Sequence, residues 1–576
     1  MKKKRDRRPF ILPLLALPFL AASLLSGCGT NPTRQTQQPE VLRLLYWQAP
    51  TILNPHLSIG FKDWEASRIT LEPLATFNNQ GELIPVLAAE VPTVENGGVA
   101  ADGLSVTWKL KPDIQWSDGT PFTAADVVFT YEFISNPETA SGNSSNYDAI
   151  ASVEAVDSLT VKVNFNAVNP GWFLPFVGSE GMILPQHIFA DYTGANSRQA
   201  PGNLLPVGTG PYRVVEFRPG DTVVYESNPY FREAETLYFQ RIELKGGGDS
   251  TSAARAVLQT GDADYAYGLQ VEPQVLEQLE AGGQGQVMAI FGPLSERIQL
   301  NQTDPNRATA AGDRSSLEFP HPFFRDRQVR QAFNLAIDRN TISQQLYGVT
   351  GTPTPNFLVS PPTYLSPNTR FEFNLEQAAA LLEKAGWRDT NGNGIRDKNG
   401  VEMRVLFQTS VNPVRQKTQE IIKQNFKTIG VEMEIKSIDA SIFFSGDPSN
   451  TDSLNRFYAD LQMVTTGNTS PDPTRYLQTF TCKEIARPEN SWSGSNTSRY
   501  CNPEYDKLWQ RSTTELSQKT RGELFIQMND LLVKDVAVIP LIHRADAIAV
   551  SNSLEGVELT SWDRVVWNIH QWRRKE

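Results

Sequence analysis

The segment 389–397, with the sequence DTNGNGIRD, carries oxygen donors at the spacing of a calcium-binding loop. Such a loop places oxygen ligands at positions 1, 3, 5, 7 and 9 and a glycine at position 6. Position 12 is Gly400, where such loops place a glutamate that binds through both oxygens. The sequence is compatible with two interpretations of this segment, a structural calcium site and a plain turn. The calcium ligands would be Asp389, Asn391, Asn393, the carbonyl of Ile395, and Asp397.

Histidine, cysteine and serine patterns that would indicate catalysis are missing from the sequence. The five histidines are scattered, with no H-x-x-x-H or H-E-x-x-H spacing for zinc, and no G-x-S-x-G nucleophile motif occurs. Carboxylates are plentiful, but none stands out as a general acid/base pair. We therefore expect a protein that is not an enzyme and requires no cofactor. The histidine of the ILPQHIF segment, His187, is predicted to pack or cap rather than to bind a ligand.

The N-terminus has the features of an export signal. Six basic and one acidic side chain lie in residues 1–27, and the apolar run 10–25 contains two prolines, which is too short and too kinked for a stable membrane span. The run ends in Leu-Ser-Gly-Cys, similar to a lipobox, so Cys28 is predicted to be lipidated and to become the mature N-terminus. Residues 28–40 then form a flexible tether. An ordinary signal peptide with an incidental cysteine is the alternative.

Two further cysteines remain, Cys482 and Cys501. An even pair in an exported protein predicts a disulfide, and two free thiols are the alternative. The loop that such a bond closes, about 20 residues long, corresponds to roughly 3 kcal/mol of stabilisation. The predicted localisation is outside the cytoplasm, with the protein held by lipid on a membrane that faces the periplasm or the cell exterior.

Composition and charge describe an ordinary globular chain of 576 residues with a formal net charge of −11. Without residues 1–27, the formal charge is −16. An acidic surface of this kind repels nucleic acid and anionic lipid, so we expect no nucleic-acid partner. The length is sufficient for about three or four domains.

The segment 104–131, LSVTWKLKPDIQWSDGTPFTAADVVFTY, predicts a strand, a turn and a helix. Apolar and polar residues alternate from Leu104 to Leu110, as in a half-buried strand. Ser117-Asp118-Gly119 supplies the turn. Thr123 caps the helix, and Asp126 stands where a capping box requires an acid.

The same segment resembles the fingerprint of the family 5 extracellular solute-binding proteins, the peptide, dipeptide and nickel receptors of ABC importers. The matching pattern is W-x-L-x-x-x-I-x-W-S-D-G-x-P-F-T-A-x-D-V-V-F-T-Y. A second specific match is F-R-D-R-Q-V-R-Q-A-F followed by A-I-D-R, within residues 324–339. The resemblance covers essentially all of residues 41–576.

The resemblance implies an α/β fold like that of the type II periplasmic binding proteins, with two lobes, hinge crossovers and a smaller inserted domain. Lobe 1 comprises residues 41–80, 206–290 and 535–576, the inserted domain 81–205, and lobe 2 291–534. Within lobe 2, the residues themselves predict a strand over 403–407, a helix over 413–429 and a strand over 431–435. That order predicts a right-handed parallel crossover.

The ligand site is expected between the lobes. In peptide-binding relatives, a loop after a lobe 2 strand ends in an acid–proline pair, and an aspartate three residues earlier holds the α-ammonium group of the peptide. Here the acid is Asp472, the anchor position holds Thr469, and the upstream aromatic is replaced by Thr466. This difference puts a free-amine peptide in doubt, unless the loop shifts and Asp472 takes the role. A merely polar loop over 465–470 is the alternative. The predicted ligand-binding residues are Phe61, Tyr147, Asp439, Thr465, Thr466, Gly467, Asn468, Thr469 and Asp472, with Trp64 a weaker candidate.

The predicted function is that of the substrate-binding component of an ABC importer. The protein would capture a peptide-like small solute between its lobes and deliver it to the permease subunits in the membrane. It is expected to be a lipid-anchored monomer. The alternative is an exported structural or chaperone-like lipoprotein that uses the same scaffold without transport.

Overall fold

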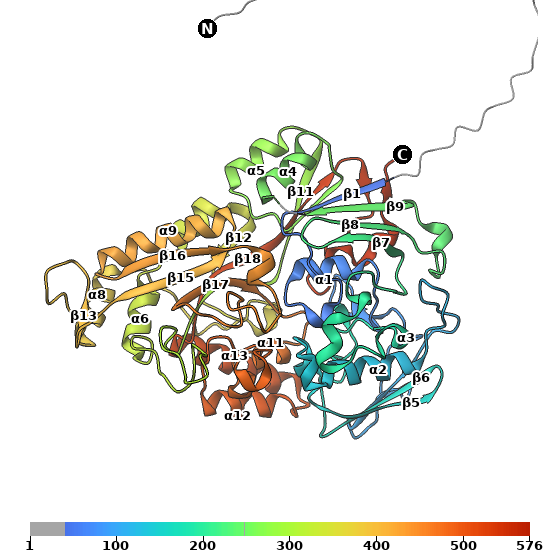
Figure 1. The fold of residues 1–576 in the computed structure, drawn as a ribbon, viewed down its shortest axis with the longest axis horizontal. Coiled ribbons are helices and arrows are strands. Elements are labelled where there is room, and N and C mark those ends of the chain that lie inside the picture. Colours follow the sequence, from blue (N-terminus) through green and yellow to red (C-terminus); the bar gives the residue numbers. More distant parts are fainter. Residues whose placement is uncertain (1–40, 247) are drawn as a thin grey trace, which may run out of the picture. The chain divides into compact units, whose positions relative to one another are not determined.

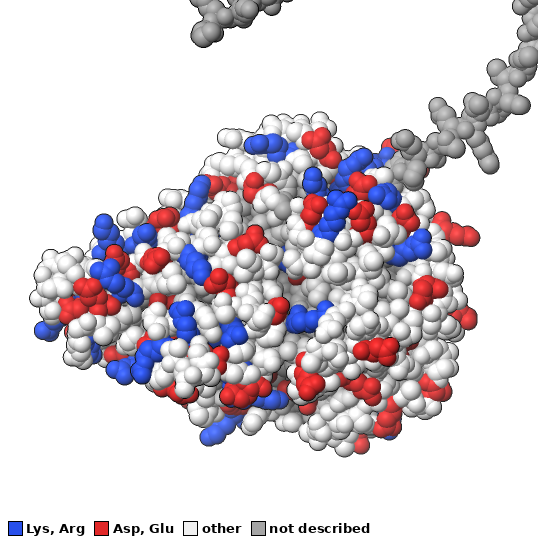
Figure 2. Space-filling view, in the orientation of Figure 1, with Lys and Arg blue, Asp and Glu red and all other residues white. Residues whose placement is uncertain are grey.

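The computed structural model describes residues 41–246 and 248–576. The predicted signal peptide, the predicted lipidation at Cys28 and the tether lie outside the described residues. Within the described ranges, no helix combines the length and the apolar content that crossing a bilayer requires. On the face shown in Figure 2, basic and acidic side chains are interspersed, and no broad basic tract of the kind that binds nucleic acid is visible there.

One mixed sheet runs through both lobes (Figure 1), in the order β16-β15-β17-β11-β18-β10-β1-β9-β8-β7, and β12 pairs with β18 beside this path. The lobe 1 strands are β1 (Val41–Tyr46), β7 (Tyr212–Arg218), β8 (Thr222–Ser227), β9 (Arg241–Gly246) and β10 (Tyr265–Tyr267). The lobe 2 strands are β12 (Gly351–Pro353), β15 (Arg404–Ser410), β16 (Glu432–Ile438) and β17 (Leu461–Thr466). The continuous sheet means that the lobes share a hydrogen-bonded backbone.

Two long antiparallel strands connect the lobes, namely β11 (Gly285–Leu300) and β18 (Val538–Ser551). Their register is interrupted between Phe291 and Ser295, which pair with Ala545 and His543, so three residues of β11 face one residue of β18. A bulge of this kind bends a strand and weakens the local ladder. This interruption is the candidate hinge. It begins one residue after the predicted lobe boundary at 290, and the predicted boundary at 535 falls at the end of the helix that precedes β18.

The parallel pairing and the connecting helix of the predicted crossover in lobe 2 are present. β15 pairs in parallel with both β16 and β17, and helix α9 (Pro413–Thr428) connects β15 to β16. Asn412 caps this helix by accepting a hydrogen bond from the Arg415 amide at 2.9 Å. Gly430, with φ of 77°, ends the turn that follows, since glycine adopts the left-handed conformation without strain.

Further helices of both lobes pack around the sheet (Figure 1). In lobe 1 these are α1 (Phe61–Arg68), α4 (Ser250–Leu258) and α5 (Pro273–Glu280). In lobe 2 they are α6 (Arg327–Leu335), α7 (Arg339–Ile342), α8 (Leu375–Lys384), α10 (Ala440–Phe443), α11 (Thr474–Gln478), α12 (Pro503–Ser512) and α13 (Gln518–Asp535). The last three, α11, α12 and α13, gather below the sheet in Figure 1. Short two-stranded ladders are made by β2 (Ala75–Phe77) with β3 (Leu83–Pro85), β13 (Asp397–Lys398) with β14 (Val401–Glu402), and β19 (Leu554–Glu555) with β20 (Arg573–Arg574).

The inserted domain has its own sheet, in the order β4-β6-β5, and its own apolar core. Its elements are β4 (Ser105–Lys109), α2 (Ala124–Ser135), β5 (Ile150–Asp157), β6 (Thr160–Phe165) and α3 (Gln186–Phe189). The predicted capping box at the start of α2 is confirmed, with Thr123 and Asp126 in reciprocal hydrogen bonds. His187 Nε2 lies 2.7 Å from Asp118 Oδ2, so this histidine ties α3 to the predicted turn rather than to a ligand.

Candidate ligand-binding site

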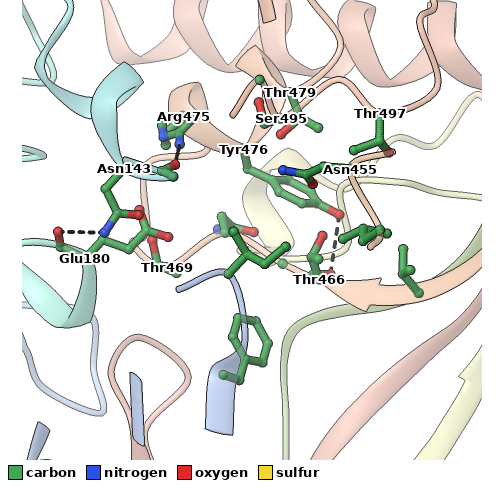
Figure 3. A pocket seen from close by; sticks show the side chains of 18 of the residues that line it. Asn143, Glu180, Asn455, Thr466, Thr469, Arg475, Tyr476, Thr479, Ser495 and Thr497 are labelled. Atoms are coloured by element: carbon green, nitrogen blue, oxygen red, sulfur yellow. Dashed lines mark hydrogen bonds between the residues drawn. The ribbon is translucent and has the colours of Figure 1, made fainter. Parts of the chain in front are cut away.

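A cavity of about 160 Å³ lies between the lobes (Figure 3). Residues 58–64 of lobe 1 and Asn143 and Glu180 of the inserted domain line one side. β11, the end of β17 and the segments 467–469 and 493–497 line the other. A smaller cavity of about 70 Å³ adjoins it and shares five lining residues, namely Ile59, Phe61, Leu454, Val464 and Thr466. The two cavities form one interlobe cleft, where the sequence predicted the ligand.

Most of the predicted loop lines this cleft. Thr466, Gly467, Asn468 and Thr469 contact the larger cavity. The side-chain oxygen of Asn468 is buried without a hydrogen-bond partner, while its amide donates to Ser470 O at 2.8 Å. The Thr469 hydroxyl offers no charge at the position where the relatives' anchor aspartate would stand.

Thr465 lines the smaller cavity, but its hydroxyl is already engaged. It donates to Glu296 Oε2 at 2.6 Å and accepts from Arg415 Nη2 at 3.0 Å. Asp472 lies behind the loop, nearly buried, and pairs with Arg521. One of its oxygens also accepts from the Thr474 amide at 2.9 Å. These contacts engage the Asp472 carboxylate behind the loop. In this structure the loop is not shifted in the way that would bring Asp472 to the ligand.

Two further predicted residues lie away from the cleft lining. Tyr147 is buried in the core of the inserted domain, where its ring packs edge-on against Phe176 at 5.2 Å. Asp439 is an exposed N-cap of α10 that accepts from the Ser441 amide at 2.8 Å. By contrast, Phe61 and Trp64, in the first turn of α1, both line the cavity as predicted.

Sequence reasoning missed the charged residues of the cavity, which are Glu180, Arg297 and Arg475. Glu180 accepts from Asn146 Nδ2 at 2.8 Å, and Arg475 donates to the Gly142 carbonyl at 3.2 Å across the interlobe boundary. Figure 3 places Asn143 and Glu180 on the inserted-domain side of the cavity and Tyr476 beside Thr466 in lobe 2. No local motif marks these residues, because they come from three segments that only the fold brings together.

A buried ionic network supports the wall of the cleft at the hinge. Glu296 on β11 is fully buried. It accepts a hydrogen bond from Arg415 Nε at 3.0 Å, and Arg544 on β18 lies 3.8 Å away. Burial pushes the pKa of Glu296 upward, but the two guanidinium groups outweigh burial and hold that pKa below its usual value. Glu296 is therefore charged and fully committed to its protein partners, Arg415, Thr465 and Arg544.

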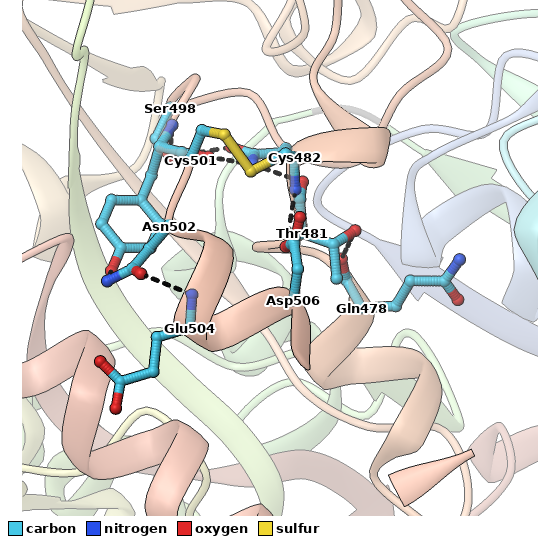
Figure 4. The surroundings of a disulfide bond; sticks show 10 residues. Gln478, Thr481, Cys482, Ser498, Cys501, Asn502, Glu504 and Asp506 are labelled. Atoms are coloured by element: carbon cyan, nitrogen blue, oxygen red, sulfur yellow. Dashed lines mark hydrogen bonds between the residues drawn. A yellow bond between two sulfur atoms is a disulfide. The ribbon is translucent and has the colours of Figure 1, made fainter. Parts of the chain in front are cut away.

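The predicted disulfide between Cys482 and Cys501 is present (Figure 4). The Cys482 amide donates to Asp506 Oδ1 at 3.1 Å, which ties the bond to α12. The loop that it closes contributes Ser493, Gly494, Ser495 and Thr497 to the cavity. Thr497 also donates to Gln299 Oε1 on β11 at 2.9 Å. The disulfide thus closes a loop of lobe 2 that also forms part of the site.

The carboxylate oxygens of the candidate calcium loop accept hydrogen bonds from groups of the loop itself. Asp389 accepts hydrogen bonds from the amides of Gly392, Asn393 and Gly394, at 2.7 to 3.2 Å. Both oxygens of Asp397 accept from Thr390. Within the described part of the chain, no group of three or more histidines, cysteines or carboxylates is arranged to hold a metal.

Comparison with known proteins agrees with this geometry. Residues 82–486 match the model described as "Bacterial extracellular solute-binding proteins, family 5 Middle". The oligopeptide-binding protein AppA of Bacillus subtilis is 26% identical over 98% of this chain and 99% of its own length. A structure of AppA from Bacillus subtilis in complex with a nonapeptide aligns with a TM-score of 0.79 and 22% identity, covering 94% of this chain and 100% of that one. NikZ from Campylobacter jejuni in complex with Ni(L-His) aligns with a TM-score of 0.77 and 23% identity, covering 93% and 99%. This chain belongs to family 5 of the bacterial extracellular solute-binding proteins.

Proposed function

We propose that this protein is the substrate-binding component of an ABC importer, and that it captures a peptide-like solute between its lobes for delivery to a membrane permease. The observation that carries the proposal is the cavity at the interlobe boundary, which residues of both lobes and of the inserted domain line. Ligands of such proteins are held where domain closure surrounds them. The oligopeptide-binding proteins of Bacillus subtilis and Haemophilus influenzae, both similar over nearly the whole chain, support a peptide-like cargo.

The cleft is suited to binding rather than to chemistry. Among the described residues, its lining contains neither a histidine nor a cysteine, and Glu180 is its one carboxylate. General acid/base catalysis requires a titratable group of suitable pKa beside the reacting atom, often oriented by a second group. The family that this chain matches is described as solute-binding, and we propose that the protein binds its solute without transforming it.

Mass spectrometry of the small molecules that co-purify with the exported protein tests this function. We expect peptides, and we expect re-addition of those peptides to raise the melting temperature of the unloaded protein, because a ligand that binds only the folded state stabilises it by mass action. Recovery of lipid or haem alone would contradict the proposal. An absence of any melting-temperature shift with peptides, sugars and metal chelates would favour the structural or chaperone-like alternative.

The lipid anchor at Cys28 is proposed from the sequence Leu-Ser-Gly-Cys and from the apolar run that precedes it. We expect Cys28→Ala to leave the protein in the soluble exported fraction and to abolish incorporation of labelled fatty acid, since one attached lipid is the basis of membrane retention. A variant that still takes up label and stays on the membrane would contradict the anchor. Light scattering of the released variant tests the expected monomer.

For the loop 389–397 we propose a structural turn, supported by the internal hydrogen bonds of Asp389 and Asp397. We expect calcium and a chelator to leave the melting temperature unchanged. A saturable rise with calcium that a chelator reverses, and that Asp389→Asn abolishes, would assign the loop to calcium instead. Asp313→Asn, in another loop, is the control.

A further inference from the structure

Arg297 on β11 is a cation inside the wall of the proposed ligand cavity. Its side chain is 2% exposed, and it lines the larger cavity. Its guanidinium carbon lies 5.0 Å from the ring centre of Phe357, and that ring stacks on Tyr476 at 4.2 Å. The two rings hold the guanidinium in place by cation–π attraction, so the charge is positioned before any ligand arrives.

The protein offers this cation few partners. Nη1 donates to the Ser295 carbonyl and to the Tyr476 hydroxyl, both at the long distance of 3.4 Å, and Nε has no hydrogen-bond partner among the described residues. No carboxylate among the described residues lies within ion-pair distance of Arg297. The adjacent Glu296 points to the other face of β11, because side chains alternate along a strand, and it is committed to Arg415.

The rest of the cleft does not supply the missing negative charge. Four arginines and one carboxylate, Glu180, are the charged residues that line the two cavities. Glu296 lies behind the wall and faces two of these arginines, Arg415 at 3.0 Å and Arg544 at 3.8 Å, so its single charge offsets one of the two. Arg297 and Arg475 remain, against Glu180. A buried charge without a partner is strongly unfavourable, so the counter-charge has to come from the ligand.

We infer that the ligand carries a carboxylate that pairs with Arg297, and that this contact anchors it in the cleft. The inference rests on the proposed function and specifies its substrate class, a peptide-like anion. It also accounts for Thr469. A site that selects its solute through a carboxylate has no need of an acidic group at residue 469. The carboxylate is an acidic side chain or the C-terminus of a peptide, and both sources share the same chemistry.

Peptide pools tested on the unloaded wild-type protein distinguish these sources. The probes are pools of two to eight residues that differ only in containing Glu, Gln or Lys, each with a free or an amidated C-terminus. Melting temperature reports stabilisation, and mass spectrometry after dialysis identifies the retained peptides. We expect at least about tenfold tighter binding whenever the decisive carboxylate is present, since charge-assisted hydrogen bonds are the stronger ones.

The outcomes separate the inference from the function that it assumes. A preference for Glu over Gln assigns the carboxylate to a side chain. A preference for a free over an amidated C-terminus, with Glu and Gln equal, assigns it to the terminus. Equal binding of all pools, or a preference for Lys, overturns the anionic anchor while leaving a peptide receptor. Binding of no pool overturns the proposed function itself.

Variants at residue 297 give a second test. We expect Arg297→Gln to weaken binding of the preferred pool by at least tenfold and to remove its preference for the carboxylate, and Arg297→Lys to retain part of that preference. Arg404→Gln, at an exposed arginine of β15, is the matched control. Retention of the full preference in Arg297→Gln overturns the inference. If Arg297→Gln does not fold, the ranking of pools on the wild-type protein still decides.

Discussion

At the scale of single residues, Thr469 stands where the resemblance inferred from the sequence places an anchoring aspartate. Its neutral hydroxyl lines the cavity near Glu180 and Arg475. We predict that the wild-type protein binds N-acetylated and free-amine peptides with similar affinity. Thr469→Asp should create a preference of at least about tenfold for the free amine, because a hydrogen bond between charged groups contributes about 1.5–3 kcal/mol.

Isothermal titration with paired acetylated and free peptides measures that preference. Thr469→Asn, which has a similar shape without the charge, is the control and should leave the two affinities similar. A strong preference for the free amine in the wild-type protein would contradict the prediction, and would assign the ammonium group to Glu180, the one carboxylate that lines the cleft.

Glu65 on α1 is a second informative residue, because it is fully buried in lobe 1 with only half of its carboxylate satisfied. Oε1 accepts from the Val565 amide at 3.1 Å, and Oε2 has no partner. Burial raises its pKa to about 8; Arg564 opposes that rise, and Asp546 and Asp563 add to it. The carboxyl group is thus protonated in the folded protein near neutral pH.

This shift predicts how stability depends on pH. Below the unfolded pKa of 4.5, Glu65 is protonated in both states and its contribution is fully present. As the pH rises toward about 8, unfolding releases the proton, so stability is lost across that window. We expect Glu65→Gln to lose less stability than the wild-type protein across this window. The melting temperature of the variant, relative to that of the wild-type protein, should therefore increase from pH 5 to pH 8. Glu90→Gln, at an exposed glutamate, should give a curve parallel to wild type, and a parallel curve for Glu65→Gln would refute the shift.

The residues of the site could be predicted only where they follow one another in the chain. The segment 465–469 was found because it directly follows a strand and precedes an acid–proline pair. Arg297 lies in the middle of a strand and looks like any polar residue of an alternating pattern. Its proximity to Tyr476 depends on the fold, which brings together residues 179 positions apart in the sequence. The prediction that Tyr147 binds the ligand was wrong for a similar reason. The sequence around a tyrosine does not show whether its ring faces a cleft or fills the core of a domain.

At the scale of elements, the segment between Cys482 and Cys501 connects stability to binding. It adds four residues to the cavity, and its Thr497 is hydrogen-bonded to β11. We predict that the double variant Cys482→Ser/Cys501→Ser loses about 3 kcal/mol of stability, from the entropy that the open loop regains in the unfolded chain. Ligand affinity should fall as well, because Ser493–Thr497 must then be ordered on binding.

Denaturant unfolding and titration with the co-purified ligand measure the two effects. Reduction of the wild-type protein should reproduce the variant, and Ser512→Ala, in the neighbouring helix, is a control without a change in loop closure. Unchanged affinity in the double variant would show that the segment keeps its bound conformation without the disulfide.

Elements with strong local signals were predicted well, and elements defined by distant partners were not. The capping box of α2 and the crossover through α9 follow from residues within a few turns of each other. The continuous sheet depends on pairing of β11 with β18, whose residues are about 250 positions apart. Apolar alternation identifies such strands without naming their partners. The hinge bulge between Phe291 and Ser295 is a property of that pairing and leaves no local signal.

At the scale of the whole described molecule, individual side chains cross the boundary between lobe 2 and the inserted domain, apart from the sheet that the two lobes share. Arg198 of the inserted domain donates to Gly446 O of lobe 2 at 2.8 Å and to Leu57 O of lobe 1 at 3.4 Å. Lys483 pairs with Asp148 across the same boundary, and both side chains are solvent-exposed. An exposed ion pair contributes about 0–1 kcal/mol, so Arg198 is the more important of the two contacts.

This difference predicts how the lobes close. We expect Arg198→Gln to populate a more open form without ligand, and to weaken ligand binding by about tenfold, because apparent affinity scales with the fraction of binding-competent protein. Lys483→Gln, which crosses the same boundary at an exposed site, should change affinity by less than about threefold. Small-angle scattering of the unloaded variants and titration with the co-purified ligand measure the two effects. An equal effect of both substitutions would mean that general electrostatic attraction, rather than the two carbonyl contacts of Arg198, holds the lobes together.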